Sequence, residues 1–493
     1  MMKKSKLKNT LLIIFNVIFL LVISFCFHFA LLNPFNQKLN KGFVFFLFLL
    51  LCLGFLFLCF ITKNLSKRSL LIISIINLII FILLQIFFGY FFAVNPGWDM
   101  TPIFNSSTNV ASNEWEFFSS YFYELYPNNI FITVLWMKFY KLCYYFGFNL
   151  ILSSVVINII VVLISVIITY ILIKKVFNIR VATISSFLFI VITPFYSYTP
   201  IFYTDTLTMI FLPLAFLLFY IYIKSKNKNI FLPIFIGIIL ALGIGIKTNI
   251  AIGFIALSIF SIFIIDNLKG FFRFISLFII SFIVSSILIA STCQKYIPVP
   301  LKDAGLPSTH WIMMGLKDNG GFNGEDVDLS KNAGKTKKEI QEFNIKTIKT
   351  RLENYGIGGY SKFLYKKIQY TWGDGTYFAP EKLSRKPIRP NFLHTYIYGD
   401  KNNLFTSFSE ASHSLLLFLI LIGSIGLFKS KNKIGFLFNI CIFGVFLFLI
   451  LWEARSRYLV CILPILVSSS SIGINEILKL KPFSNNKRRL EAK

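Results

Sequence analysis

Long apolar segments alternate along most of this chain with shorter polar connections. A helix needs about 20 apolar residues to cross the roughly 30 Å hydrocarbon core of a membrane. Twelve segments meet that rule, near residues 11–32, 42–61, 69–93, 150–173, 181–201, 206–223, 230–246, 249–265, 274–292, 412–428, 434–452 and 459–475. The pattern therefore predicts an all-α polytopic membrane protein with about 12 transmembrane helices.

Basic clusters in the short connections give this bundle an orientation. With twelve spans, the clusters around Lys63, Lys174, Lys224, Lys269 and Lys429 fall on one face, together with the N-terminal lysines and the basic tail. An excess of Lys and Arg in short loops marks the cytoplasmic side of a membrane. Both ends of the bundle are therefore predicted to lie in the cytoplasm.

One segment could change this topology. Residues 129–146 are apolar enough to resemble a span, but they include Lys138, Lys141 and several tyrosines. Counting them as a span would place every later basic loop outside the cell, against the charge rule. We therefore predict a helix that lies in the outer membrane interface.

Two polar stretches on the outer side interrupt the spans. The second contains two predicted amphipathic helices, Lys337–Tyr355 and Gly359–Thr371, and it is long enough to form a small extracytoplasmic α-rich domain. The predicted organisation is N-terminal transmembrane helices (1–93), a first outer loop with the interfacial helix (94–149), a transmembrane core (150–292), the extracytoplasmic domain (293–411), C-terminal transmembrane helices (412–478) and a cytoplasmic basic tail (479–493).

Composition agrees with a membrane protein and excludes other classes. The 493 residues are 56% hydrophobic, which is more apolar surface than one globular core could bury. The formal net charge of +28 does not indicate nucleic-acid binding, because the basic residues sit mostly in short loops between spans. The seven cysteines show no spacing typical of a disulfide framework or a metal site.

Ionisable residues gather at the predicted outer ends of the spans. Asp99 follows the turn Pro96-Gly97-Trp98, Asp205 precedes a span, and Lys247 lies between two spans. Glu453, Arg455 and Arg457 precede the last span. Charged groups at the rim of a bundle are costly to hold and are candidates for function, although each one could also simply end a helix or extend to the interface.

These residue types favour one kind of chemistry. Arg binds phosphate through two parallel hydrogen bonds and Lys binds it as a point charge. A nearby carboxylate can take a proton from an incoming hydroxyl as a general base. The combination at a lipid surface indicates transfer of a group from a lipid phosphate to an acceptor.

The same residues resemble a known family. The residues that carry the resemblance are an early outer acid, Tyr126-Pro127-Asn128-Asn129, Tyr203-Thr204-Asp205, a glycine-containing turn from Gly243 or Gly245 through Lys247 to Thr248, and a late Arg-Tyr pair. In this order they resemble membrane glycosyltransferases of the GT-C fold, in the group of protein mannosyltransferases and aminoarabinose transferases. The resemblance covers roughly residues 90–265 and 440–475. It implies Asp99 as the catalytic carboxylate and Asp205 as a second active-site acid. It also implies that Lys247, Arg455 and Arg457 lie near the phosphate of a polyprenyl-phosphate-linked sugar.

The chain departs from the family pattern at Met100, where many relatives carry a second acid. Glu114 and Glu116 are the candidates to supply a second carboxylate, and the alternative is that one carboxylate suffices. His310 is a candidate phosphate ligand, although a lone histidine is more often structural. The sequence indicates no definite cofactor and leaves a divalent metal open.

Several aromatic residues are candidates to contact the sugar or the acceptor. Trp and Tyr rings stack on sugar rings, and they also form belts at membrane surfaces. The candidates are Trp98, Trp311, Trp372 and Tyr458.

The sequence thus predicts an enzyme of the cell membrane, with its site on the extracytoplasmic face. It would move a sugar from undecaprenyl phosphate to a cell-wall polysaccharide, teichoic acid or other surface glycan, and a polyprenyl-phosphate glycosyltransferase and a flippase would be its functional partners. The alternatives are a flippase or transporter of lipid-linked sugars and a polysaccharide polymerase. A transporter should show internal repeats and ionisable residues near mid-span, whereas the charges here lie at the rim.

Overall fold

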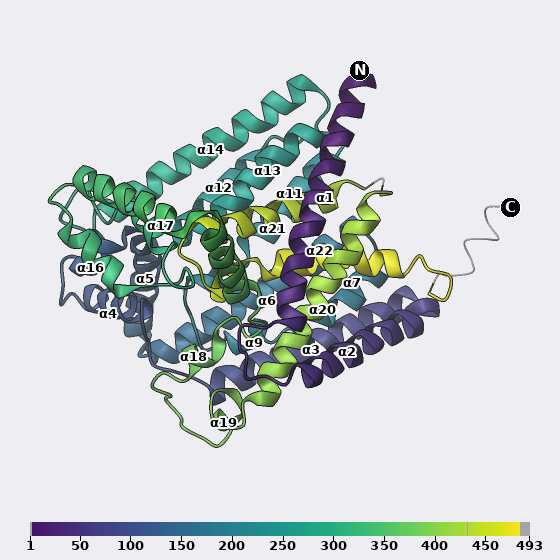
Figure 1. Cartoon of the computed structure of the whole chain (residues 1–493), viewed down its shortest axis with the longest axis horizontal. Coiled ribbons are helices and arrows are strands. Elements are labelled where there is room, and N and C mark those ends of the chain that lie inside the picture. The colour runs from purple at the N-terminus through teal and green to yellow at the C-terminus, as the bar shows by residue number, and fades with distance from the viewer. Residues whose placement is uncertain (1, 431, 484–493) are drawn as a thin grey trace.

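Helices make up nearly all the regular structure of this protein (Figure 1). The computed structural model describes residues 2–430 and 432–483. Within them the backbone forms no strand, and an isolated antiparallel bridge joins Val94 to Pro387. The predicted all-α class is confirmed. Of the predicted basic tail, residues 484–493 lie outside the described part.

Nine helical segments in the described residues are long and apolar enough to cross a membrane. They contain α1 (Met2–Leu32), α2 (Lys41–Ile61), α3 (Lys67–Phe91), α6 (Leu150–Val176), α10 (Thr204–Leu207) with α11 (Phe211–Lys224), α14 (Leu268–Gln294), α20 (Asn403–Leu427), α21 (Ile434–Leu451) and α22 (Leu463–Ile477). Three shorter apolar stretches are α7 (Ile179–Ser186) with α8 (Leu188–Val191), α12 (Phe231–Ile246) and α13 (Ala251–Ile264). Each of the twelve predicted segments overlaps one of these helices or shorter stretches.

Polar residues in the connections begin several of these helices. The side-chain oxygens of Asn40, Ser66, Asn149, Asn178 and Asn267 accept hydrogen bonds from backbone N–H groups in the following first turn. Such N-caps satisfy amides that have no partner within the helix. They explain why apolar runs of similar composition begin at definite residues.

The segment predicted as one span at 181–201 differs from that expectation. Its helix ends at Val191, and residues 193–203 form short turns around α9 (Pro194–Ser197). The backbone leaves helical geometry at Ile192, where ψ is 100°. Pro194 has no N–H to continue the helix, and it takes the first position of α9, where no N–H is needed. Side chains of neighbouring helices satisfy the freed carbonyls: Gln85 donates to Phe195 O at 2.7 Å and Asn158 donates to Thr199 O at 2.8 Å.

The bundle has an inner and an outer layer. α22 is almost entirely buried and packs closely on α20, where Gly423 and Gly473 leave no room for side chains. α14 instead exposes Ile280, Ile283, Ile287 and Leu288 on the surface. A large exposed apolar face on so long a helix fits contact with lipid.

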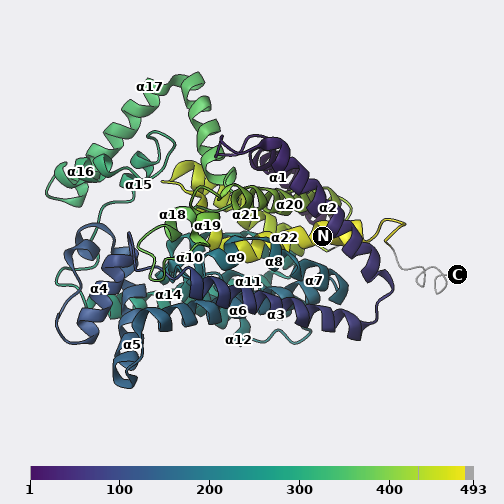
Figure 2. The same cartoon turned by 90° about the horizontal axis from the view of Figure 1, so that it is seen from below.

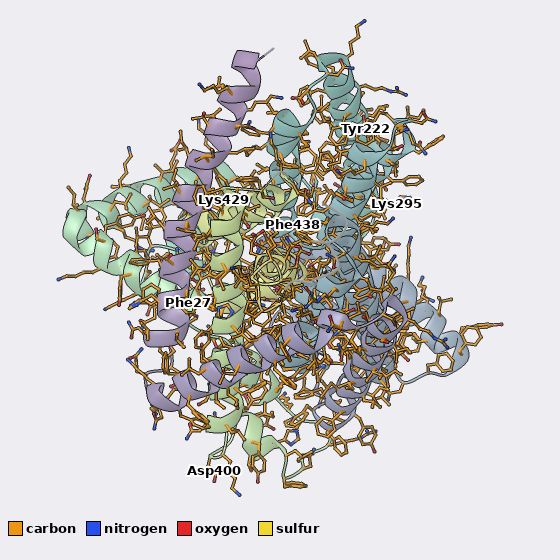
Figure 3. All side chains as sticks on the ribbon, turned by 90° about the vertical axis from the view of Figure 1, so that its right-hand side faces the viewer. Phe27, Tyr222, Lys295, Asp400, Lys429 and Phe438 are labelled. Carbon is orange, nitrogen blue, oxygen red and sulfur yellow. The ribbon has the colours of Figure 1, made fainter. Side chains whose placement is uncertain are left out.

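The polar elements gather at one end of the molecule. α4 (Met100–Ala111), α5 (Ile130–Phe146), α15 (Thr309–Met314), α16 (Gly324–Asn332) and α17 (Lys337–Trp372) lie on the left of Figure 1, away from the start of α1. α18 (Ala379–Leu383) and α19 (His394–Ile397) lie at its lower edge. Figure 3 shows Asp400 and Lys429, which flank α20, at opposite ends of that helix.

Two predicted helices of the outer region appear at the expected positions. α5 runs across the direction of α3, α6 and α14, as Figure 2 shows, and its place in the membrane interface stays a prediction. α17 is two helices joined by a kink at Gly356, whose positive φ of 56° favours glycine. The predicted boundary between 355 and 359 falls at this kink.

Candidate active site

Two carboxylates from distant segments meet at the end of the bundle that carries α4, α5 and α17. Asp99 occupies the N-cap of α4, after a turn in which Trp98 adopts a left-handed φ of 55°. Asp205 lies in the first turn of α10, just after the irregular stretch that follows α8. The side chain of Asp205 is 1% exposed and that of Asp99 is 32% exposed, so Asp99 is the carboxylate that a ligand can reach.

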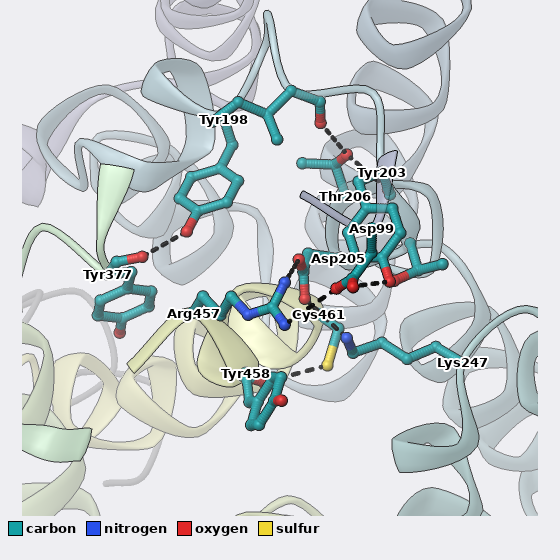
Figure 4. Close-up of polar contacts among 12 residues, drawn as sticks. Asp99, Tyr198, Tyr203, Asp205, Thr206, Lys247, Tyr377, Arg457, Tyr458 and Cys461 are labelled. Carbon is teal, nitrogen blue, oxygen red and sulfur yellow. Dashed lines mark hydrogen bonds and ion pairs between the residues drawn. The ribbon is translucent and has the colours of Figure 1, made fainter. Parts of the chain in front are cut away.

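Arg457 lies between the two acids (Figure 4). One of its guanidinium nitrogens is 3.6 Å from Asp99 Oδ2, and another is 3.9 Å from Asp205 Oδ2. Lys247 Nζ lies 2.7 Å from Asp205 Oδ1. Two acids and two cations therefore form a cluster in which opposite charges balance, as ions held largely away from water require, and Asp99 is its exposed member.

Phenol and amide groups orient Asp99. The Tyr121 hydroxyl donates to Asp99 Oδ1 at 3.0 Å, and Asn129 Nδ2 donates to the Tyr121 oxygen at 3.2 Å. Tyr203 lies within reach of Asp99 Oδ2 at 3.5 Å. Burial raises the pKa of Tyr121, and the negative charge of Asp99 raises it further, so this phenol keeps its proton and acts as a donor.

A pocket opens beside Asp99. Its lining includes Pro96, Gly97, Asp99, Met100, Tyr203, Lys382 and Arg385. A pocket with a partly exposed carboxylate and two cations on its wall has the groups needed to hold an anionic substrate and to accept a proton.

The connection between α21 and α22 brings Arg455 and Arg457 to this place. Ser456 Oγ donates to Asp374 Oδ2 at 2.6 Å, and the Tyr458 hydroxyl donates to the Glu453 carboxylate. Burial raises the pKa of Glu453, while the charge of Arg457 acts in the opposite direction. Hydrogen bonds from both sides of Arg457 thus fix the backbone that presents its guanidinium.

Trp98 forms part of an aromatic and cationic stack. Its ring stacks on Phe378 with centroids 5.3 Å apart. Lys382 Nζ and Arg385 Cζ lie 3.6 Å and 3.3 Å from the Trp98 centroid, and Arg455 Cζ lies 3.3 Å from the Phe378 centroid. Such cation–π contacts hold charged groups over aromatic faces at small desolvation cost.

Most of the residues predicted at the rim lie in this site. The structure brings together Trp98, Asp99, Asp205, Lys247, Arg455, Arg457 and Tyr458. Tyr458 contributes its ring 5.1 Å from Lys247 Nζ.

Other predicted residues lie elsewhere. Glu114 and Glu116 are exposed and are absent from the lining of the pocket. His310 is buried in the outer domain against Ser330 Oγ at 2.8 Å, and burial lowers its pKa to about 4. Trp311 packs on Tyr126, and Trp372 is buried beside Phe446. Among the described residues, no group of three or more His, Cys, Asp or Glu side chains is arranged to hold a metal ion.

Sequence reasoning did not identify Tyr121, Asn129, Tyr203, Lys382 and Arg385 as site residues. Asn129 belongs to the Tyr-Pro-Asn-Asn motif, which was a usable signal. Lys382 and Arg385 stand among several other charged residues of the outer domain, and no local pattern distinguishes them.

Comparisons with known proteins give a family and several structural likenesses. A family described as "conserved hypothetical integral membrane protein" matches residues 4–477. Among curated proteins, none matches the sequence.

The similar solved structures are membrane transferases. The oligosaccharyltransferase AglB of Archaeoglobus fulgidus, in complex with an inhibitory peptide and a dolichol-phosphate, is 14% identical, with a TM-score of 0.40 over 83% of this chain and 50% of that one. Its apo form gives 14% identity and a TM-score of 0.45 over 87% and 52%. ArnT from Cupriavidus metallidurans, bound to undecaprenyl phosphate, is 11% identical, with a TM-score of 0.37 over 84% and 78%.

The chain spans about half the length of the archaeal oligosaccharyltransferase. At these TM-scores the likenesses carry no argument about activity, which has to come from the site itself.

Proposed function

The chain belongs to this family of conserved integral membrane proteins, and from that premise we propose that it is a membrane glycosyltransferase. It moves a sugar from a polyprenyl-phosphate donor, of the undecaprenyl-phosphate type, to a hydroxyl of a cell-wall polysaccharide, teichoic acid or other surface glycan. The observation that carries the proposal is the reachable Asp99 carboxylate, held by Tyr121 and Arg457 on the wall of a pocket that also presents cations.

The proposed reaction is a single displacement at the anomeric carbon. Asp99 takes the proton of the acceptor hydroxyl as its oxygen bonds to that carbon. The bond between the anomeric carbon and the phosphate oxygen breaks, and its electron pair leaves with the lipid phosphate. One displacement inverts the anomeric centre, and nearby cations stabilise the negative charge that develops on the phosphate.

The buried charges hold Asp99 in place for this step. The Asp205–Lys247 pair, with its 2.7 Å contact, gives Arg457 a fixed negative neighbour on the side away from Asp99. Arg457 then balances the charge of Asp99 until the acceptor arrives. Of the three cations predicted to lie near the phosphate, Arg455 has no ion-pair partner among the described residues, so it is the one whose charge is available to a ligand.

The proposed side of the membrane follows from the charge pattern. The site lies at the end that carries α4, α5 and α17, whereas the basic connections around Lys174, Lys224 and Lys429 belong to the other end. Short basic loops mark the cytoplasmic side. The site would therefore face outward, where it receives donor made and flipped by other membrane proteins.

The experiment that tests this function is Asp99→Asn. Asparagine keeps the shape and can still accept from Tyr121, but it is a far weaker base, so sugar transfer should fall about 100-fold or more. The sugar composition of surface glycans, from strains that carry each variant as the sole copy, measures the loss. Glu114→Gln, an exposed acid outside the pocket, serves as the control and should keep transfer.

Unchanged glycan decoration by Asp99→Asn, in membranes with normal protein levels, would contradict the catalytic role of Asp99.

A further inference from the structure

Two cations on the pocket wall take no part in the balanced cluster. Lys247 and Arg457 pair with Asp205 and Asp99. Lys382 and Arg385 line the same pocket, yet among the described residues neither has a hydrogen-bond or ion-pair partner, and their contacts are with the Trp98 ring. The wall of the pocket therefore presents two cations that, among the described residues, have no hydrogen-bond or ion-pair partner.

The buried position of Lys382 is unusual for a charged side chain. Its side chain is only 8% exposed, and burial lowers its pKa well below the ordinary value for lysine. The charge of Arg457 adds to this shift, whereas the charges of Asp99 and Asp205 oppose it. A buried ammonium without a partner destabilises the folded protein, and such groups are rare unless a ligand pairs with them. Lys382 nevertheless lines the same pocket as Asp99.

Backbone hydrogen bonds fix the two cations beside Asp99. Asn95 N donates to Lys386 O at 3.1 Å, and Ile388 N donates to Ala93 O at 2.9 Å, so residues 386–388 run along 93–95. Gly97 leaves space for Arg385, because a Cβ there would lie 3.2 Å from Arg385 Cδ. The outer domain thus contributes one wall of the pocket in a fixed register with the Asp99 turn.

We propose that Lys382 and Arg385 bind the phosphate of the lipid-linked donor and stabilise it as it leaves. The inference rests on the proposed function and adds two residues of the outer domain to it. When the bond between the anomeric carbon and oxygen breaks, its electron pair stays on the phosphate, which changes from a diester to a more negative monoester. Arg385 offers parallel donors to two phosphate oxygens, and Lys382 offers a point charge.

The experiment measures binding of polyprenyl monophosphate to the full chain in lipid nanodiscs. Lys382→Met with Arg385→Gln should weaken binding at least about tenfold, because each cation supplies charged hydrogen bonds to the phosphate. Lys386→Gln is the matched control, since its side chain is exposed and is absent from the pocket lining, and it should bind as the unchanged protein does. Equal binding by the double variant would overturn the inference.

Two further probes identify the ligand. Polyprenol, which lacks the phosphate, should bind weakly and to the same extent in both proteins. Inorganic phosphate should compete only at much higher concentrations than polyprenyl phosphate. If inorganic phosphate binds as tightly as the lipid does, the site takes free phosphate and the lipid assignment is wrong.

Thermal unfolding separates binding from a structural role. Removing an unpartnered buried charge should leave the Tm of Lys382→Met unchanged or raise it. A lowered Tm together with lost binding in Lys382→Arg, which keeps the charge, would show that Lys382 is structural and would overturn the inference.

Asp99→Asn separates this inference from the proposed function. It should keep polyprenyl-phosphate binding while losing sugar transfer. If Asp99→Asn transfers sugar normally but the double variant loses binding, the proposed mechanism fails and the phosphate site stands. If the double variant binds normally while Asp99→Asn loses transfer, the proposed mechanism stands and the phosphate site is wrong.

Discussion

Arg457 is the residue on which the arrangement of the site depends. It is the only side chain in the described cluster with ion-pair contacts to both acids, and its backbone lies between hydrogen bonds made by Ser456 and Tyr458. The nitrogen that faces Asp205 stays 3.9 Å away and has no hydrogen-bond partner among the described residues. The guanidinium therefore retains an unused donor, buried beside Asp205.

Lys367, in α17, binds the backbone of the segment between α21 and α22 that carries Arg457. Its ammonium donates to Gly315 O at 2.6 Å and to Trp452 O at 2.7 Å. Burial lowers its pKa to about 7, and the charge of Glu453 opposes this shift. Between pH 7 and the ordinary lysine pKa, the unfolded chain binds more protons at this residue than the folded protein does, so stability rises with pH in that window.

We expect Lys367→Met to remove this dependence. The Tm of the unchanged protein should rise between about pH 7 and pH 9 by more than that of the variant, as measured by thermal unfolding in nanodiscs. Lys366→Met is the control, because the neighbouring lysine is exposed and should leave the slope unchanged. A variant with the same slope as the unchanged protein would show that Lys367 does not titrate in this range.

At the scale of elements, glycine allows α12 and α14 to approach closely. A Cβ on Gly237 would lie 2.5 Å from the Phe278 carbonyl oxygen and closer still to Ser281 Oγ. Small residues at such crossings let transmembrane helices gain van der Waals contact. The contact between α12 and α14 is among the most extensive in the bundle.

Gly237→Ala should therefore destabilise the protein by about 1–3 kcal/mol, the usual cost of overpacking a well-packed contact. Gly54→Ala in α2 meets no atom within 4 Å and should be neutral or stabilise by up to about 1 kcal/mol, because alanine favours helix. Unfolding midpoints of both variants check the difference. Equal effects would show that the α12–α14 contact adjusts without cost.

The elements also show what the sequence could and could not predict. Span positions follow from a local rule on length and apolarity, so the twelve segments were predicted. The end of the helix at Val191 depends instead on Pro194 and on the side-chain amides of Gln85 and Asn158, which are distant in sequence.

Glu114 and Glu116 are near Asp99 in sequence only. α4 is 12 residues long and extends about 18 Å, which carries the chain away from Asp99 before it reaches them.

Lys382 and Arg385 were beyond prediction for a different reason. Their position depends on backbone pairing between residues 93–95 and 386–388, nearly 300 residues apart, and the pairing involves N–H and C=O groups that every residue has. No pattern of side chains in the sequence indicates this backbone pairing.

At the scale of the whole molecule, the charge pattern predicts which end faces outward. Lys138→Cys in α5 and Asp328→Cys in α16 should react with a membrane-impermeant thiol reagent added outside intact cells, and Lys226→Cys should not. The background is low because six of the seven native cysteines are buried and Cys52 is partly buried. Labelling at position 226 from outside would overturn the topology and the proposed outward site with it.

The contact between Arg457 and Asp99 also bears on when activity can appear during synthesis. The two residues stand 3.6 Å apart in space but are separated by most of the chain, and Lys382 and Arg385 are made between them. As the ribosome delivers spans to the membrane, Asp205 can meet Lys247 early, whereas Asp99 gains its cation only when the final helices insert. A nascent chain would thus reach the outer leaflet with its acids in place but without a complete site, and it could not consume donor lipid before its own assembly is finished.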